Sequence, residues 1–173
     1  VATGNIPDSY GIGWGATGTL ACACTVITDT PGTSDGRAWT KLAFTGTPGA
    51  NGENVTFFQS FNLPAKGVVA GQSMLGGSCA IMVDAAQTGI NGITFQGTTP
   101  GAIYTSGFNV PATTDVFPTD ALDGVIVTEP WIVTPGQTST TWRVRMTFLA
   151  AVTSANIYIG QFSARQPQAG IIL

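Results

Sequence analysis

The sequence predicts an all-β fold, a two-sheet antiparallel β-sandwich of the jelly-roll type, and three observations predict it. Strand-like segments recur along the chain, and no apolar helical periodicity persists for about ten residues. Turn-rich joints separate the segments: DTPGTSDG (29–36), GTPGANGE (46–53) and VTPGQTS (133–139) are dense in Pro, Gly, Asn and Asp. Strands divided by such turns are typical of two packed antiparallel sheets.

Eight segments carry the strand signal, because each holds β-branched, aromatic or alternating apolar residues between turn residues. In chain order they are GTLACACTVIT (18–28), GRAWTKLAFTG (36–46), NVTFFQSFNL (54–63), GQSMLGGSCAIMVDA (71–85), ITFQG (93–97), GVIVTEPWIV (124–133), TTWRVRMTFLA (140–150) and ANIYIGQFSA (155–164). The segment 98–121, which contains Tyr104, is the longest stretch without clear alternation. We expect it to be a connection that packs across the sandwich or carries function. With no repeat and no linker, residues 1–173 are expected to form one domain.

The composition favours a secreted or virion protein over a cytosolic enzyme. Charged residues make up 9% of the chain, against roughly 25% in an ordinary soluble domain. A net charge of −3 and the lack of a basic cluster argue against nucleic-acid binding. No apolar run reaches the length of about 18 residues that a membrane span needs. Because the chain starts at Val1 without a signal-peptide pattern, we expect a mature chain or an excised domain of a larger multidomain protein.

The three cysteines allow two interpretations. Cys79 could form a disulfide with Cys22 or Cys24 and leave the other thiol free. Alternatively, all three are buried thiols that act as small hydrophobic residues. Without any histidine or CxxC pair, a zinc site lacks ligands.

The absence of histidine also excludes Ser-His-Asp and Cys-His catalysis. The nine acidic residues lie mostly in turns or at strand ends, where turn chemistry explains them, so we expect the chain alone not to be an enzyme. Asp29, Asp35 and Glu53 are loop acids beside neighbouring strands and are candidates for a structural calcium site. Their simpler interpretation is as solvated turn carboxylates.

Strand alternation points to a candidate ligand face. In residues 36–44 it places Arg37, Trp39 and Lys41 on the side opposite the core, and in TTWRVRMTF it places Arg143 and Arg145 outward. Four of the six cations would then lie beside an indole if the two strands share a sheet. An indole face suits the apolar patches of a sugar ring, and guanidinium groups bind carboxylates, so this face suits an acidic polysaccharide. The alternative is that the long cationic stems only cover an exposed sheet face.

Aromatic residues near the N-terminus offer a second possibility. Tyr10 and Trp14 lie among glycines in DSYGIGWGATG. They could stack on a ligand, but we favour a role as a lid that closes one end of the sandwich.

The order of the segments GNIPDSYGIGW, SDGRAWTKLAFTG, VTFFQSFNLPAKGVVAGQSM, WRVRMTF and ANIYIGQFSA resembles the galactose-binding-like jelly-roll modules. These are non-catalytic carbohydrate-binding modules appended to bacterial polysaccharide-active enzymes and esterases, with related domains in phage tail proteins. The resemblance implies a sandwich that binds glycan on a concave sheet face or at the loops of one end, often with structural calcium. On this sequence the concave-face option corresponds to Arg37, Trp39, Lys41, Arg143 and Arg145, and the loop option to Tyr10, Trp14 and Tyr104.

Two functions therefore stand as hypotheses. The first is a secreted carbohydrate-binding module that targets an attached enzyme or particle to a polysaccharide. The second is a structural or adhesion domain of a virion, tail or cell-surface protein that works as an oligomer. A free-standing carbohydrate hydrolase is the least favoured reading.

Overall fold

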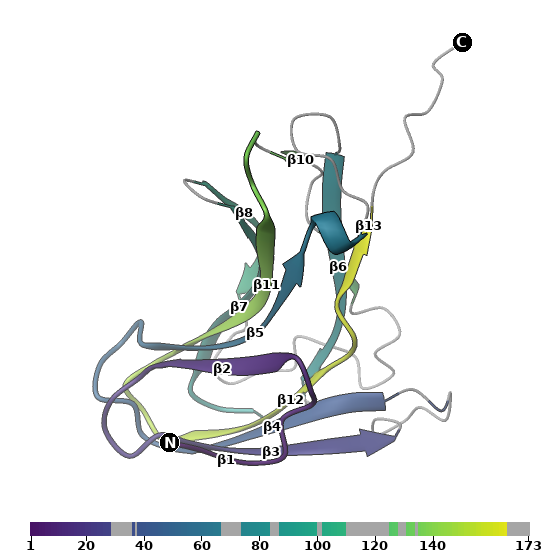
Figure 1. Cartoon of the computed structure of the whole chain (residues 1–173). Coiled ribbons are helices and arrows are strands. Elements are labelled where there is room, and N and C mark those ends of the chain that lie inside the picture. Colours follow the sequence, from purple (N-terminus) through teal and green to yellow (C-terminus); the bar gives the residue numbers. More distant parts are fainter. Residues whose placement is uncertain are drawn as a thin grey trace.

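The computed structural model places two β-sheets face to face (Figure 1). It describes residues 1–28, 36, 38–66, 74–83, 87–99, 102–109, 125–127, 131–133 and 135–165. Within these ranges only the backbone is described for 66, 74, 98–99, 102–109, 125–127, 131–132 and 164–165. None of the helices in this part of the chain is long and apolar enough to cross a membrane.

One sheet has eight strands: β1 (Ala2–Gly4), β3 (Ala21–Thr28), β4 (Ala38–Gly46), β6 (Met74–Val83), β9 (Val125–Val127), β10 (Trp131–Ile132), β12 (Thr153–Ile159) and β13 (Ser163–Arg165). Their order is β1-β3-β4-β12-β6-β10, and β9 and β13 also pair with β6. The β1–β3 pair is parallel, and the other pairs described in this sheet are antiparallel.

The second sheet has five strands: β2 (Tyr10–Gly15), β5 (Asn54–Asn62), β7 (Ile90–Thr99), β8 (Ala102–Asn109) and β11 (Ser139–Phe148). Their order is β2-β5-β11-β7-β8, with every pair antiparallel. One 3₁₀ turn, η1 (Pro64–Lys66), follows β5. Because the chain crosses repeatedly between the sheets, as in the step from β4 to β5 and from β11 to β12, the predicted two-sheet antiparallel sandwich is confirmed.

All eight expected segments contain strands, and three strands were not expected. The short β1 and the glycine-alternating β2 precede the first predicted strand. The segment 98–121 was expected to be a connection, but its first part contains β8, which pairs along its whole length with β7.

Inward-facing side chains of both sheets form the main core. Along β11 the alternation is regular, since Trp142, Val144, Met146 and Phe148 are fully buried while Arg143 is only partly buried. The same period-two pattern buries Leu42 and Phe44 of β4 from the opposite sheet. The alternation therefore predicts these inward residues correctly, whereas Ala38, which it also places inward, is exposed at the end of β4.

A chain of aromatic contacts crosses this core. Tyr10 stacks on Phe57 at 4.9 Å between ring centroids, and both rings lie edge-on to Phe162. Phe162 contacts Phe95 at 5.5 Å, and Phe95 stacks on Trp142 at 5.4 Å. Since Phe162 follows β12 and the other rings belong to the five-stranded sheet, the chain ties the two sheets together.

Close inter-sheet packing at the centre of the core depends on one residue without a side chain. A Cβ placed on Gly77 of β6 would lie 2.4 Å from Cζ3 of the Trp142 ring. Glycine at this position therefore lets the indole lie directly against the backbone of the opposite sheet.

All three cysteines are buried free thiols, so the disulfide interpretation is wrong and the interpretation as small hydrophobic residues holds. Cys22 and Cys24 lie on β3, and two strands separate β3 from Cys79 on β6. At about 4.8 Å per strand spacing the separation is about 14 Å, whereas a disulfide joins Cα atoms at most about 7 Å apart. Burial raises the pKa of all three thiols.

A second, smaller cluster lies on the other side of the eight-stranded sheet. It contains Trp39 of β4, Met82 of β6 and Tyr158 of β12, each no more than 3% exposed. Trp39 does face away from the main core, as its position in the alternation predicts, but its indole is buried rather than displayed.

Glu53 fixes the loop that leads into β5. Its carboxylate accepts hydrogen bonds from the backbone N–H of Thr17 and of Gly49, both at 2.9 Å, and from the Thr17 hydroxyl at 2.5 Å. The Thr17 side-chain hydrogen bond, followed by the backbone hydrogen bonds, lowers the pKa of Glu53.

Trp39→Ala is expected to destabilise the fold strongly. Removing a buried aromatic side chain typically lowers the free energy of unfolding by about 3–5 kcal/mol. Urea denaturation at constant protein concentration measures this loss, and Val152→Ala, at a residue that is 71% exposed, serves as the control with a change below about 0.5 kcal/mol. A Trp39→Ala protein as stable as this control would restore the exposed-indole interpretation.

Glu53→Gln is expected to remove part of the pH dependence of stability. Because the folded-state pKa of Glu53 is lowered, its contribution is complete above its ordinary pKa of about 4.3 and is lost as the pH falls through the folded value. We therefore expect the free energy of unfolding of the native protein to fall more steeply below about pH 5 than that of Glu53→Gln. Urea unfolding curves recorded from neutral to acidic pH measure both.

Thr17→Val removes the hydroxyl donor only, and it should reduce the same pH dependence in part. If the free energy of unfolding depends on pH in the same way in the native protein and in Glu53→Gln, these hydrogen bonds do not favour the ionised carboxylate.

Candidate functional site

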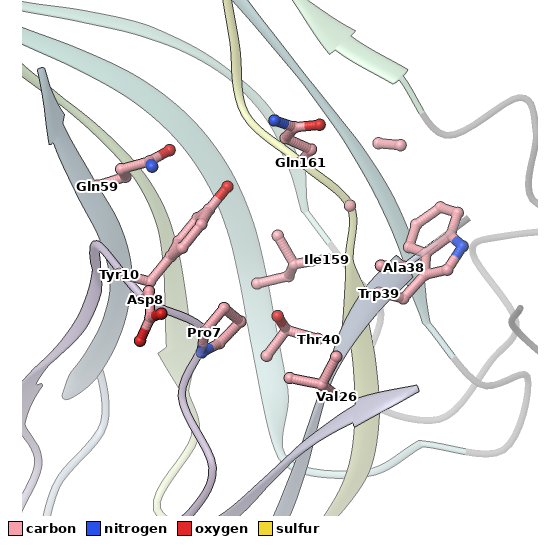
Figure 2. Close-up of a pocket in the computed structure, with 12 residues that line it drawn as sticks. Pro7, Asp8, Tyr10, Val26, Ala38, Trp39, Thr40, Gln59, Ile159 and Gln161 are labelled. Atoms are coloured by element: carbon pink, nitrogen blue, oxygen red, sulfur yellow. The ribbon is translucent and has the colours of Figure 1, made fainter. Parts of the chain in front are cut away.

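A cleft of about 550 Å³ opens where residues of both sheets meet (Figure 2). This volume lies within the range of about 300–1,000 Å³ that is usual for small-molecule sites. Its walls come from β2 and β5 of one sheet and from β3, β4, β6 and β12 of the other. The lining residues are Pro7, Asp8, Tyr10, Val26, Ala38, Trp39, Thr40, Gln59, Ala80, Ile159, Gly160 and Gln161.

Tyr10 forms part of one wall and is held in place from two directions. Its ring stacks on Phe57, and its hydroxyl accepts a hydrogen bond of 3.2 Å from the backbone N–H of Phe162. Burial raises the pKa of Tyr10, so the phenol keeps its proton at neutral pH. That proton has no acceptor among the described residues and can be donated to a ligand.

Gln59 of β5 lies directly opposite Tyr10 in the β2–β5 register. Figure 2 shows both side chains on the same side of the cleft. The Gln59 Oε1 atom is buried and has no hydrogen-bond partner within the described part of the chain. Since a buried polar atom is costly to leave unpaired, this oxygen is suited to accept a hydrogen bond from a ligand.

Among the described residues the base of the cleft is uncharged and largely apolar. Thr40 and Ile159 are no more than 5% exposed, and they lie between Tyr10 and the Trp39 indole (Figure 2). The indole fits against the backbone at Gly160, where a Cβ would lie 3.4 Å from its Cζ3 atom. Its N–H points away from the other labelled side chains in Figure 2 and has no partner among the described residues.

Four exposed residues form the rim: Asp8, Val26, Ala38 and Gln161. Asp8 supplies the only carboxylate among the described lining residues, and none of them is a Lys or Arg. The cleft thus offers hydrogen-bonding groups and apolar surface with little charge.

The single ligand face expected from strand alternation does not form. The outward positions of Trp39 and Lys41 are correct, but β4 belongs to the eight-stranded sheet and β11 to the five-stranded sheet. Arg143 and Arg145 therefore lie on the other side of the sandwich. Lys41 instead places its Nζ 5.8 Å from the centroid of the Tyr158 ring, and Arg37 is outside the described residues.

The loop-end candidates are only partly brought together. Tyr10 lines the cleft, whereas Trp14 lies further along β2 and packs half-buried against the main core. The lid role expected for Tyr10 and Trp14 stays a prediction. Tyr104 lies in β8, where only the backbone is described.

The calcium candidates are not assembled in the described structure. Asp29 and Asp35 lie outside the described residues, and Glu53 is engaged by Thr17 and Gly49. Within the described ranges no three His, Cys, Asp or Glu side chains gather to hold a metal ion. A structural calcium near these acids stays a prediction.

Sequence reasoning missed Gln59, although the sequence held a signal for it. In NVTFFQSFNL the alternation places Gln59 on the same face as the buried Val55 and Phe57. A polar residue at an inward position indicates a paired core group or a binding site.

The sequence matches no family model and no curated protein. Solved structures with a similar fold include TmCBM61 in complex with β-1,4-galactotriose, at 11% sequence identity and a TM-score of 0.51. That match covers 92% of this chain and 89% of TmCBM61.

Two larger proteins contain the same fold. One is the arabinose-bound MgGH51 α-L-arabinofuranosidase, with 14% identity and a TM-score of 0.56 over 92% of this chain and 23% of the enzyme. The other is the enzymatically active domain of tailspike protein 4 of bacteriophage CBA120, with 13% identity and a TM-score of 0.53 over 92% of this chain and 19% of that one. This chain thus spans about a fifth of the length of each. The chain has the β-sandwich fold that is also found in carbohydrate-binding modules and in a phage tailspike.

Proposed function

We propose that this chain is a non-catalytic carbohydrate-binding domain and that the cleft beside Tyr10 and Gln59 holds a sugar unit of a polysaccharide. The observation that carries the proposal is a pair of groups at the cleft. Neither the buried Gln59 Oε1 nor the proton of the Tyr10 hydroxyl has a hydrogen-bond partner among the described residues. A donor and an acceptor held side by side match the hydroxyl groups of a sugar, each of which can donate and accept.

The rest of the cleft suits the same ligand. Sugar rings present apolar C–H patches as well as hydroxyl groups, and the cleft presents the apolar Val26 and Ile159 beside neutral polar groups such as Thr40 and Gln161. Its low charge favours a neutral sugar unit. The presence of this fold in TmCBM61, whose structure contains β-1,4-galactotriose, supports the proposal.

The composition of the cleft favours binding over hydrolysis. Most glycoside hydrolases place two carboxyl groups on either side of the scissile bond. Among the described lining residues Asp8 is the only carboxylate. Asp8 at the rim can accept hydrogen bonds from sugar hydroxyls, but no second carboxylate for acid–base chemistry stands beside it in the described part of the cleft.

In this proposal the domain acts as a tether outside the cell or on a virion. A weak contact with a polysaccharide raises the effective concentration of any enzyme or particle attached to the domain. Modest affinity at each site is then sufficient. The two larger proteins with this fold fit such an arrangement, because the matched region makes up about a fifth of each.

The tailspike similarity favours a second candidate, an adhesion or structural domain that works as an oligomer. Light scattering coupled to size-exclusion chromatography separates the two functions. A monomer that binds glycan supports the first candidate, and a stable oligomer without glycan binding supports the second.

Gln59→Leu is expected to weaken glycan binding while leaving the protein as stable as before or more stable. Leucine keeps much of the volume but removes a buried oxygen without a partner, and loss of one ligand hydrogen bond lowers affinity by up to about tenfold. The measurement is isothermal titration calorimetry with the oligosaccharides that bind best on a glycan array, with β-1,4-galactotriose as the first probe. Urea unfolding of the same variant reports its stability.

Thr25→Val is the matched control, since it removes a polar group from an exposed position on β3 that does not line the cleft. It should bind glycan like the native protein. Equal affinity of Gln59→Leu and the native protein, or no binding to any glycan on the array, would refute the cleft as a carbohydrate site.

A further inference from the structure

The outer face of the five-stranded sheet carries two adjacent arginines. Arg143 and Arg145 are separated by one residue on β11, so their side chains leave the same face about 7 Å apart. Arg143 lies between Phe58 of β5 and Gln96 of β7 in the register. We call these four residues, Phe58, Gln96, Arg143 and Arg145, the arginine face.

The Arg143 guanidinium is oriented by the sheet. Its Nε–H donates a hydrogen bond of 2.6 Å to Gln96 Oε1, and Gln96 is itself only 6% exposed. This contact leaves the two Nη groups of Arg143 to form a fork of donors. A fork of this kind matches the two oxygens of a carboxylate.

Among the described residues Arg145 finds neither a charge partner nor a full set of hydrogen-bond acceptors. Its Nε is buried and has no hydrogen-bond partner among the described residues. Neither arginine forms an ion pair in the described part of the chain. Burial, and then the nearby charge of Arg145, lower the pKa of Arg143, so the two cations destabilise each other in the absence of an anion.

Phe58 provides an apolar surface beside this pair. Its ring lies over the edge strand β2, because a Cβ on Gly11 would approach the ring to 2.6 Å. The next outward residue of β2, Gly13, also has no side chain, and a Cβ there would meet the Thr56 hydroxyl. The ring therefore lies low on the sheet, and it is only partly buried.

We propose that the arginine face is a second ligand site, which binds a sugar unit bearing a carboxylate, as in a uronic acid polysaccharide. Arg143 and Arg145 bind the carboxylate, and the Phe58 ring contacts the apolar face of the sugar. The proposal rests on the carbohydrate-binding function proposed above and names an acidic ligand class for it. The cleft lies between the sheets and this face on the outside of one sheet, so the two sites can be tested separately.

The test compares an oligogalacturonide with its fully methyl-esterified form, because esterification replaces each charged carboxylate by a neutral methyl ester and leaves the sugar rings and their linkages unchanged. The native protein should bind the acidic form at least about tenfold more tightly, since charge-assisted hydrogen bonds are stronger than neutral ones. Arg143→Gln and Arg145→Gln should each remove most of this preference. The affinity for the acidic form should also fall as salt is added.

Lys41→Gln is the matched control, because it removes one positive charge from the other sheet. Its affinity for the acidic form should stay within about twofold of the native value, as expected for a screened, distant charge. Arg143→Lys keeps the charge but loses the fork, so it should bind the acidic form more weakly than the native protein. This variant tests the role of Arg143 if Arg143→Gln folds poorly. Nuclear magnetic resonance should show the Nε–H signals of Arg143 and Arg145 shifting with the acidic ligand alone.

Equal binding of the two ligand forms would overturn the proposal, and so would an equal loss of affinity in Lys41→Gln and the arginine variants. The cleft is monitored in parallel with a neutral oligosaccharide and Gln59→Leu. If the neutral oligosaccharide binds in a way that depends on Gln59 and the acidic form is not preferred, the arginine face alone is refuted. If the acidic form binds in a way that depends on Arg143 and Arg145 and the neutral oligosaccharide does not bind, the cleft alone is refuted.

Discussion

The aromatic chain between the two sheets is the interaction on which the rest of the structure depends. It runs from Tyr10 at the cleft through Phe57, Phe162 and Phe95 to Trp142 at the centre of the core. Because Phe162 follows the last long strand of the eight-stranded sheet, ring packing sets the separation of the sheets and also fixes one wall of the cleft. The hydrogen bond from the Phe162 backbone to the Tyr10 hydroxyl joins the same two segments. The same ring contacts therefore bury apolar surface, which stabilises the fold, and hold the wall that shapes the candidate site.

Local patterns predicted most of the fold, because they depend only on which face of a strand each residue occupies. The regular alternation in β4 and β11 identified the inward residues of both strands. β2 was missed because its outward positions are glycines, which are rare in strands. The structure explains them, since the Phe58 ring and the Thr56 side chain occupy the space above Gly11 and Gly13. A sequence shows a glycine but not the side chain of another strand that requires it.

The candidate site was harder to predict than the fold, because it depends on which strands become neighbours. Alternation correctly turned Trp39 and Arg143 away from the core, yet it carries no information about the sheet to which each strand belongs. Pairing of β4 with β12 and of β11 with β5 and β7 is a long-range outcome, and it separates the indole from the arginines. The cleft combines residues from six strands and two loop segments. Local signals were limited to Tyr10 and Trp39, which were assigned to two different candidate sites, and to the polar Gln59 at an inward position.

The three buried thiols have a consequence for the lifetime of the folded state. While the sandwich is closed, burial keeps Cys22, Cys24 and Cys79 protonated and out of reach of oxidants. Any global opening in an oxidising medium exposes an odd number of reactive sulfur atoms, and a disulfide formed between two copies would block refolding. In such a medium the lifetime of the folded protein would then be set by the rate at which it unfolds, rather than by the equilibrium free energy of unfolding.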